Sequence, residues 1–355
     1  MTCIHKRFSR LSGVLRLASS SAVSVSRLPF RPRFPWIGGD LQTLRQVLKP
    51  GPQVVGPGTE RRVVPLGDGD ALVVAIDRPA QQRHPTLVLV HGLTGCEGSP
   101  PVIATARAAV LRGHAVVRVN LRGAGPSAPL CRGTYHAGRV EDLASVLQAL
   151  AADPAADLVA PGVVLHGISL GGNQVLKLAA EPSSESRVRA VVSVSAPIDL
   201  RAASKRFLAP RNWLYHRWLL GRMKAAAMPW SPAEAAAIAS ANTVWEFDDR
   251  FIAPRHGFDG AEDYYARCSA APLVPTIQCP ALLIHAETDP WIPADAYHAL
   301  SPATGLTVLV ARDGGHVGFH AAGSPEAWSD RQTFAWLAAL GLSAPTPPPL
   351  DVRRR

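Results

Sequence analysis

A serine between glycines is the first feature of this sequence whose type and spacing could support chemistry. Gly167-Ile168-Ser169-Leu170-Gly171 follows the apolar run Val163–His166 and precedes a helical pattern over Asn173–Ala180. A serine on a tight strand-to-helix turn adopts a sparsely populated backbone conformation, and glycines on either side remove side chains that would clash there. The helix that follows directs its positive end toward the serine and favours developing negative charge. We therefore predict that Ser169 is a nucleophile.

A serine hydroxyl is a weak nucleophile at neutral pH, so it needs a base within hydrogen-bond reach. His316 ends the segment Asp313-Gly314-Gly315-His316, just after an apolar run, and the glycines allow this loop to fold back toward Ser169. Asp289 follows the run Ala281–His285, at the edge of a parallel sheet where active sites collect. The order serine, acid, histidine is one in which such triads occur. We predict His316 as the base and Asp289 as the orienting acid.

Other titratable residues compete for these two roles. Glu287 is the competing acid and Asp313 a more distant one, but an Asp-Pro turn after a strand is the usual position of the acid and favours Asp289. His320, four residues after His316, is the rival base, and it lacks a flexible glycine approach. The remaining histidines near strand ends or helices are expected to pack or form hydrogen bonds, namely His91, His136, His166 and His285.

Two backbone amides are needed to hold the oxyanion that forms when a serine attacks a carbonyl. One candidate is the amide of Leu170, the residue after Ser169. The other is the amide of Leu93, in the turn His91–Gly95 that follows the apolar run Thr86–Val90. We expect these two amides to form the oxyanion hole.

The elements that must position these residues alternate along the chain. Short apolar runs separated by amphipathic segments predict βα units around a mostly parallel central sheet flanked by helices, an α/β fold. The runs expected to form strands are Ala71–Ile76, Thr86–Val90, Ala115–Asn120, Val163–His166, Ala190–Val194, Ala281–His285 and Leu306–Val310. A turn at Gly67–Asp70 predicts a hairpin entering the sheet, and apolar spacing predicts helices over 140–150 and Ser329–Leu340.

The chain is long enough for one large core with a lid. We expect residues 34–342 to form one α/β domain, with a helical lid at about 200–275, where aromatic residues are frequent and no strand pattern occurs. Without His or Cys at ligand spacing, Asp248-Asp249 is interpreted as hydrogen-bonding the lid to the core. Residues 1–33 are a basic extension, either disordered, a start placed too far upstream or a targeting segment. Residues 343–355 are expected to be a disordered tail rich in Pro and Arg.

Composition limits the possible partners. The formal charge of +10 lies in the tails, because residues 1–33 hold seven basic residues and no acidic one, and residues 351–355 add a net +2. The body between them is nearly neutral, which argues against nucleic acid as a partner. The sequence has no uninterrupted window of 18 or more apolar residues, so we predict no membrane-spanning helix. Five scattered cysteines fit a reducing compartment, so we expect a cytoplasmic location; the sequence leaves the oligomeric state open.

Several separate segments together resemble the YheT-like branch of the α/β-hydrolases. The resemblance runs from about Pro29 to Gly341, and Phe247-Asp248-Asp249 and Gly314–Phe319 are more specific to this branch than G-x-S-x-G. The other segments that carry it are Pro35-Trp36, Leu41-Gln42-Thr43, His91–Gly95, Arg122-Gly123, Tyr135-His136, Asp142-Leu143, Gly167–Asn173, Ser195-Ala196-Pro197, Ala253-Pro254, Gly257-Phe258, Asp263-Tyr264-Tyr265 and Asp289-Pro290.

The resemblance implies an α/β-hydrolase fold with a helical lid, a triad of Ser169, Asp289 and His316, and hydrolysis of short-chain esters or monoacylglycerol-like lipids. No metal or organic cofactor is needed for this chemistry. The sequence departs from the branch at Asp40, where His is common, and at Cys96-Glu97, where small polar residues are usual. An acyltransferase using the same triad, or a non-catalytic ligand-binding protein on the same fold, are the alternatives.

Overall fold

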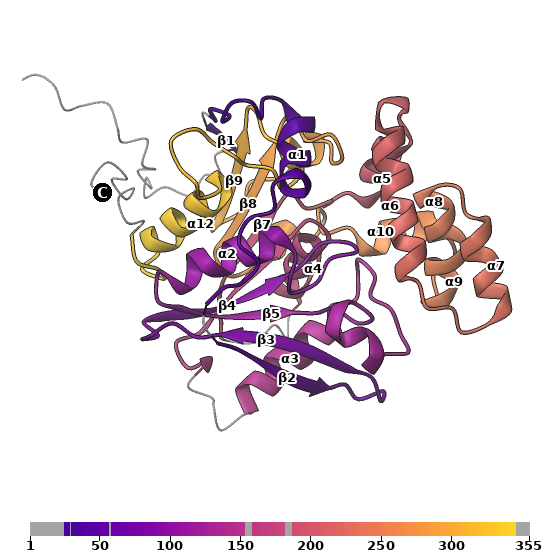
Figure 1. The fold of residues 1–355 in the computed structure, drawn as a ribbon, viewed down its shortest axis with the longest axis horizontal. Coiled ribbons are helices and arrows are strands. Elements are labelled where there is room, and N and C mark those ends of the chain that lie inside the picture. Colours follow the sequence, from indigo (N-terminus) through magenta and orange to yellow (C-terminus); the bar gives the residue numbers. More distant parts are fainter. Residues whose placement is uncertain (1–24, 29, 57, 153–157, 182–186, 346–355) are drawn as a thin grey trace, which may run out of the picture.

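The computed structural model describes residues 25–28, 30–56, 58–152, 158–181 and 187–345 (Figure 1). The strands of this part are β1 (Val25–Leu28), β2 (Thr59–Pro65), β3 (Ala71–Asp77), β4 (His84–Val90), β5 (His114–Val119), β6 (Val163–Ile168), β7 (Val188–Val194), β8 (Ala281–Ala286) and β9 (Leu306–Ala311). Each of the seven predicted apolar runs overlaps one of these strands.

The nine strands of the described ranges form one sheet in the order β1-β9-β8-β7-β6-β4-β5-β3-β2. Neighbouring strands pair in parallel except at one edge, where β3 is antiparallel to both β2 and β5. The predicted α/β fold with a mostly parallel sheet is thereby confirmed. The hairpin is also found, since Pro65 pairs with Ala71 across a turn in which Gly69 has a φ of 90°.

Helices cover both faces of the sheet. The helices outside the interval 200–276 are α1 (Gly39–Leu48), α2 (Pro100–Val110), η1 (Gly125–Leu130), α3 (Glu141–Ala152), α4 (Leu170–Ala180), α11 (Asp295–His298) and α12 (Trp328–Ala339). Apolar residues of α3 and α4 pack on one face, and those of α2 and α12 pack on the other. Because both faces are covered, β5, β6 and β8 consist of buried residues throughout, which is why they read as continuous apolar runs.

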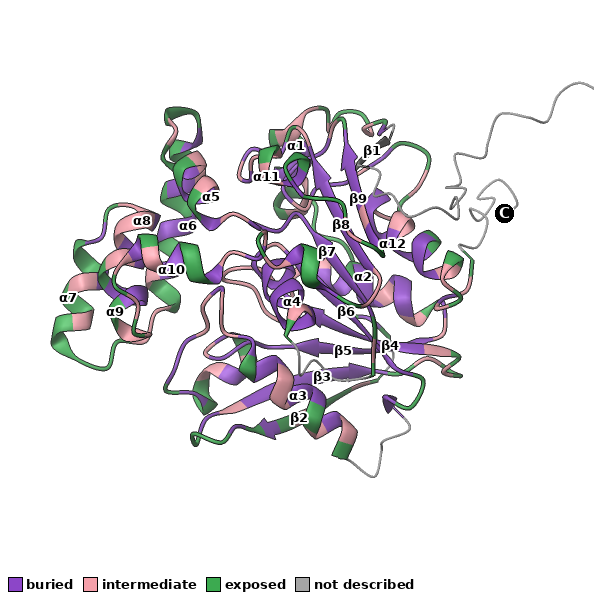
Figure 2. Cartoon of the chain, turned by 180° about the vertical axis from the view of Figure 1, so that it is seen from behind, coloured by how far each residue is buried: buried purple, intermediate pink, exposed green. Residues whose placement is uncertain are grey.

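The interval between β7 and β8 is helical. Its elements are α5 (Leu200–Leu208), η3 (Pro210–Asn212), α6 (Trp213–Ala226), α7 (Pro232–Ser240), α8 (Val244–Phe247), the π-helical η4 (Asp248–Ile252), α9 (Ala253–Arg255), α10 (Ala261–Cys268) and η5 (Val274–Thr276). Most of these helices form a lobe beside the sheet with an apolar cluster of its own, and their outward faces are exposed (Figure 2). We refer to residues 200–276 as the lid lobe.

The folded body begins earlier than residue 34, which was the predicted first residue of the α/β domain. Residues 25–28 form β1, which pairs in parallel with β9 at the sheet edge. Phe30 is buried and its ring lies 5.9 Å from that of Trp328 and 6.3 Å from that of Phe319. Backbone pairing and this aromatic contact therefore join part of the basic extension to the core. Residues 1–24 and 346–355 lie outside the described residues.

Candidate active site

The turn between β6 and α4 holds Ser169 in a strained conformation. Ser169 has φ 54° and ψ −122°, and its amide donates a 2.8 Å hydrogen bond to the carbonyl of Val194. A Cβ on Gly167 would lie 2.2 Å from the carbonyl oxygen of Gly171, and a Cβ on Gly171 would lie 2.4 Å from that of Val90. Both glycines are thus required by backbone contacts, as the pattern of the turn predicts.

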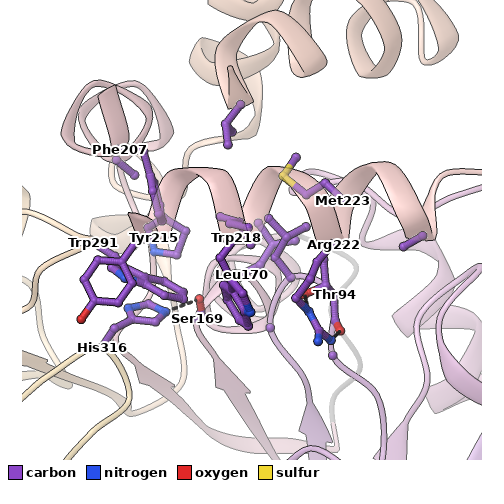
Figure 3. A pocket seen from close by; sticks show the side chains of 18 of the residues that line it. Thr94, Ser169, Leu170, Phe207, Tyr215, Trp218, Arg222, Met223, Trp291 and His316 are labelled. Atoms are coloured by element: carbon purple, nitrogen blue, oxygen red, sulfur yellow. Dashed lines mark hydrogen bonds between the residues drawn. The ribbon is translucent and has the colours of Figure 1, made fainter. Parts of the chain in front are cut away.

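Three side chains from distant parts of the chain form one hydrogen-bonded series, and Figure 3 shows its contact between Ser169 and His316. Ser169 Oγ lies 2.8 Å from Nε2 of His316, and Nδ1 of His316 lies 3.0 Å from Oδ2 of Asp289. The acceptor-only carboxylate assigns the proton to Nδ1, which leaves Nε2 free to accept from the serine hydroxyl. Asp289 Oδ1 accepts from the amides of Trp291 and Ile292 at 2.8 and 3.0 Å. The structure thus brings the three predicted residues together.

The environment of Asp289 favours its ionised form. Burial alone would raise its pKa, but the neighbouring His316 and the hydrogen bonds outweigh burial and hold the pKa below its usual range. The two competing acids have other partners: Glu287 contacts Nε2 of His298 at 3.0 Å, and Asp313 accepts from Thr288 Oγ1 at 3.1 Å. Asp289 is therefore the acid that the fold aligns with His316.

The other histidines occupy structural positions. His320 Nδ1 accepts from Arg45 at 3.0 Å, and burial with nearby arginines lowers its pKa to about 3. Both ring nitrogens of His91 are used, by the carbonyl of Gly92 at 2.7 Å and the amide of Leu121 at 3.1 Å, and burial lowers its pKa to about 4. Burial likewise lowers the pKa of three further histidines, His136, His166 and His285.

The predicted oxyanion amides lie on two elements that meet at Ser169. Leu170 begins α4, and Leu93 belongs to the turn after β4; both residues line the cavity that holds Ser169. Among the described residues, neither amide donates to a protein acceptor. The next residue, Thr94, has a φ of 57°, and its amide donates to the hydroxyl of Tyr135 at 2.6 Å. The amide of Thr94 is therefore engaged within the described part of the protein, whereas that of Leu93 is not.

Helix α1 holds the loop of His316, a role that the sequence analysis missed. The hydroxyl of Thr43 accepts from the amide of His316 and donates to the carbonyl of Gly39, both at 2.7 Å. A Cβ on Gly315 would lie 2.4 Å from the amide nitrogen of Thr43. Gln42, also buried, accepts from the amide of His320 at 2.7 Å. In the sequence, the available sign of this role was a pair of adjacent polar residues, Gln42 and Thr43, on an amphipathic helix.

Trp291 is a second residue that sequence reasoning did not identify. Its ring stacks on the imidazole of His316, with centroids 4.4 Å apart and planes inclined by 23° (Figure 3). Trp291 follows Asp289-Pro290 directly, so one turn supplies both the carboxylate and the stacking ring. The rotation of His316 is limited by these two contacts.

A cavity of about 1100 Å³ opens over Ser169 between the sheet and the lid lobe. Tyr215, Trp218, Arg222 and Met223 of α6 lie above the serine (Figure 3). Arg222 also donates to the carbonyl of Thr94 at 3.0 Å, which joins the lid lobe to the oxyanion turn. Most of the cavity wall is apolar, as a site for an acyl chain requires.

Among the described residues, no group of three or more His, Cys, Asp or Glu residues is arranged to hold a metal ion. None of the helices there combines the length and apolar character needed to cross a bilayer.

Known proteins resemble this chain in sequence and in fold. The sequence profile of the alpha/beta hydrolase fold matches residues 85–322. The provisionally named esterase YheT of Escherichia coli is 35% identical over 77% of this chain and 82% of its own length. Monoacylglycerol lipase of Saccharomyces cerevisiae is 26% identical over 73% of this chain and 58% of its own length. The solved structure of the Pyrococcus furiosus esterase Pf2001 has a TM-score of 0.53 and 17% identity over 81% of this chain and 98% of its own, a likeness of fold alone.

Proposed function

Because this chain belongs to the α/β-hydrolase family, as its resemblance to the YheT-like branch predicted, we propose that it is a serine hydrolase of carboxylic esters. The observation that carries the proposal is the series of hydrogen bonds from Asp289 through His316 to Ser169, of 3.0 and 2.8 Å. The names of the relatives, an esterase and a lipase, support hydrolase activity in general.

The reaction follows from the direction of these hydrogen bonds. Ser169 Oγ attacks the ester carbonyl while Nε2 of His316 takes its proton, and Asp289 stabilises the imidazolium. The amides of Leu93 and Leu170 hold the oxyanion. His316 then gives its proton to the leaving alcohol, and the acyl group stays on Ser169. A water molecule that loses a proton to His316 attacks the acyl-enzyme, which releases the acid and restores Ser169.

We propose short-chain esters or monoacylglycerol-like lipids as substrates. The apolar wall of the cavity and its volume of about 1100 Å³ support an acyl chain of several carbons. A p-nitrophenyl ester series of increasing chain length would give the preferred acyl length as the maximum of kcat/KM. If transfer of the acyl group to added glycerol exceeded hydrolysis, the enzyme would be an acyltransferase.

The test of the catalytic serine is labelling with a fluorophosphonate probe, which reacts with activated serines. The wild type is expected to be labelled, and Ser169→Ala to lose both labelling and at least about a thousandfold in ester hydrolysis. Ser145→Ala is a matched control, because this serine bonds only within its own helix, to the carbonyl of Glu141 at 3.0 Å. Equal labelling of wild type and Ser169→Ala, or none of wild type, would refute the proposal.

A further inference from the structure

A polar cluster lies in the apolar wall of the cavity, inside the lid lobe. Asp248 begins η4, Tyr265 belongs to α10 and Ser204 to α5, and all three line the cavity that contains Ser169. Their neighbours along the wall are apolar, including Phe247, Phe251 and Leu200. The sequence analysis interpreted Asp248-Asp249 as joining lid to core, but the hydrogen bonds of both carboxylates stay within the lid lobe.

The hydrogen bonds of this cluster leave one acceptor unused. The Tyr265 hydroxyl lies 2.7 Å from Oδ2 of Asp248 and 3.1 Å from Oγ of Ser204. Since Tyr265 has one hydroxyl hydrogen, it donates to the carboxylate and accepts from Ser204. Asp248 is only 7% exposed; among the described residues its Oδ1 has no hydrogen-bond partner, and this oxygen keeps some access to solvent. Burial raises its pKa to about 7.

An acceptor without a protein partner in an otherwise apolar wall favours a ligand that carries a hydrogen-bond donor. The neighbouring Asp249 shows the contrast, because its Oδ1 accepts from the amide of Ala261 at 2.9 Å and it does not line the cavity. The Oδ1 atoms of the two residues therefore differ, because that of Asp249 has a partner in the protein and that of Asp248, a residue that lines the cavity, has none among the described residues.

We propose that Asp248, supported by Tyr265 and Ser204, is a subsite that binds a hydroxyl group of the ester substrate. This inference rests on the proposed function and names the kind of ester that the site selects. The hydroxyl can belong to the leaving alcohol, as in a glycerol monoester, or to the acyl chain, as in a hydroxyacyl ester. In both cases the hydroxyl donates to Oδ1 of the carboxylate.

Three esters of matched size test the subsite: propyl hexanoate, 2,3-dihydroxypropyl hexanoate and propyl 6-hydroxyhexanoate. In the wild type at about pH 8.5, where the Asp248 carboxyl is ionised, kcat/KM for one hydroxylated ester should exceed that for propyl hexanoate by about tenfold to a hundredfold, as for a hydrogen bond to a charged group. The favoured ester identifies whether the hydroxyl lies on the alcohol or the acyl side. Asp248→Leu should reduce this ratio to about 1 while propyl hexanoate is still cleaved.

Two variants separate recognition from damage to the lid lobe. Asp248→Leu combined with Tyr265→Phe leaves no unpaired hydroxyl on α10, and it should show the same loss of preference. Asp249→Leu, which removes the neighbouring carboxylate, should keep the wild-type ratio. The subsite is refuted if wild type prefers neither hydroxylated ester, or if Asp248→Leu keeps the preference.

Failure of the subsite and failure of the proposed function are distinguishable. Cleavage of propyl hexanoate with no preference for a hydroxyl would refute the subsite alone. If no ester were cleaved, the hydrolase proposal would fail, and calorimetry would test the subsite with 1-O-hexylglycerol, 6-hydroxyhexyl propyl ether and hexyl propyl ether. Tighter binding of one hydroxylated ether, lost in Asp248→Leu, would support a hydroxyl subsite, and equal binding by both proteins would refute it.

Discussion

Both oxygens of the Asp289 carboxylate have partners, and this fixes the imidazole of His316. Oδ1 accepts from the amides of Trp291 and Ile292, so the carboxylate cannot rotate freely, and Oδ2 is left to accept from Nδ1 of His316. The ring of Trp291 closes one face of the imidazole. Orientation of the base is therefore determined by a turn of four residues that follows β8.

The first prediction concerns this orienting acid. Asp289→Asn replaces an acceptor by an amide that can donate to Nδ1, which favours the wrong tautomer of His316, and kcat is expected to fall by about a thousandfold to ten thousandfold. Glu287→Gln, on the same turn, should stay within about threefold of wild type. Steady-state kinetics on a p-nitrophenyl ester measures both variants. A kcat for Asp289→Asn above one tenth of wild type would contradict the assignment.

Sequence reasoning identified the catalytic candidates because each stands on a local pattern. Ser169 stands between glycines after an apolar run, and Asp289 and His316 each follow one. Trp291 could not be identified in this way, since an aromatic residue in a loop has no pattern that distinguishes stacking on a base from packing. Its position became visible only with the distance between two rings.

At the scale of elements, α1 acts on the site through the backbone of the histidine loop. Thr43 holds the amide of His316, while Gln42 holds that of His320 and donates to the carbonyl of Trp36 at 2.6 Å. These side chains supply hydrogen bonds to backbone amides of the loop, which has no regular secondary structure to pair them. Helix α1 thus positions the base without contacting its imidazole.

Thr43→Val tests this positioning role, because it keeps the shape of the side chain and removes the acceptor of the His316 amide. We expect kcat to fall by about tenfold with KM little changed, since a buried amide is left unpaired and the base shifts. Thr43→Ser retains the hydroxyl and should restore kcat. Equal losses in Thr43→Ser and Thr43→Val would mean that the hydroxyl has no such role.

Another contact between elements predicts a dependence of stability on pH. Asp330 of α12 accepts from Thr105 of α2 at 2.8 Å, and burial raises its pKa to about 7. The folded protein therefore keeps this proton to higher pH than the unfolded chain, whose aspartates ionise near pH 4. The stability that Asp330 contributes is fully present below about pH 4 and is lost as pH rises through 7.

Asp330→Asn carries no such proton, so its stability should change less with pH. Between pH 5 and pH 8, wild type should lose roughly 2 to 3 kcal/mol more of its unfolding free energy than the variant. Urea denaturation at the two pH values measures the difference, and Asp248 titrates alike in both proteins. A parallel loss in wild type and variant would show that Asp330 is already ionised at pH 5.

The strands that are most completely buried were the ones that could be predicted from the sequence. The seven apolar runs all became strands, because strands covered on both faces need no polar alternation. Strand β2 was predicted only through the turn of its hairpin and not as an apolar run, since it lies at a sheet edge and carries the exposed Glu60 and Arg61. The segment of β1 was assigned to the basic extension, because four residues that pair through their backbone leave little trace in side-chain chemistry.

At the scale of the whole molecule, Arg122 connects parts that are distant in sequence. It forms a bidentate pair with Asp142 of α3, at 2.9 and 2.7 Å, and contacts Asp68 and Asp70 in the β2–β3 turn. Arg122 and Asp142 lie in segments that were recognised only as marks of a family, whereas Asp68 and Asp70 lie in the predicted turn. The structure gives them a shared role as one buried ion network.

Removing this cation should destabilise the protein strongly. Arg122→Leu leaves buried carboxylates without their partner and is expected to lower the unfolding free energy by about 3 to 5 kcal/mol. Arg139→Leu is the matched control, because Arg139 contacts Asp68 and Asp142 from a half-exposed position, and it should cost less than about 1 kcal/mol. Urea denaturation of the two variants would contradict the prediction if their losses were equal.

The lid lobe lies between β7 and β8, within the 147 residues of chain that separate Ser169 from His316. A ribosome makes these parts in order, so the turn that carries Ser169 is synthesised before the segment that carries His316. The orienting carboxylate of Asp289 follows β8, and the proton acceptor His316 follows β9, so the serine lacks both until these two strands have joined the sheet. Under the proposed mechanism, chain order therefore delays ester hydrolysis until the C-terminal strands have joined the sheet.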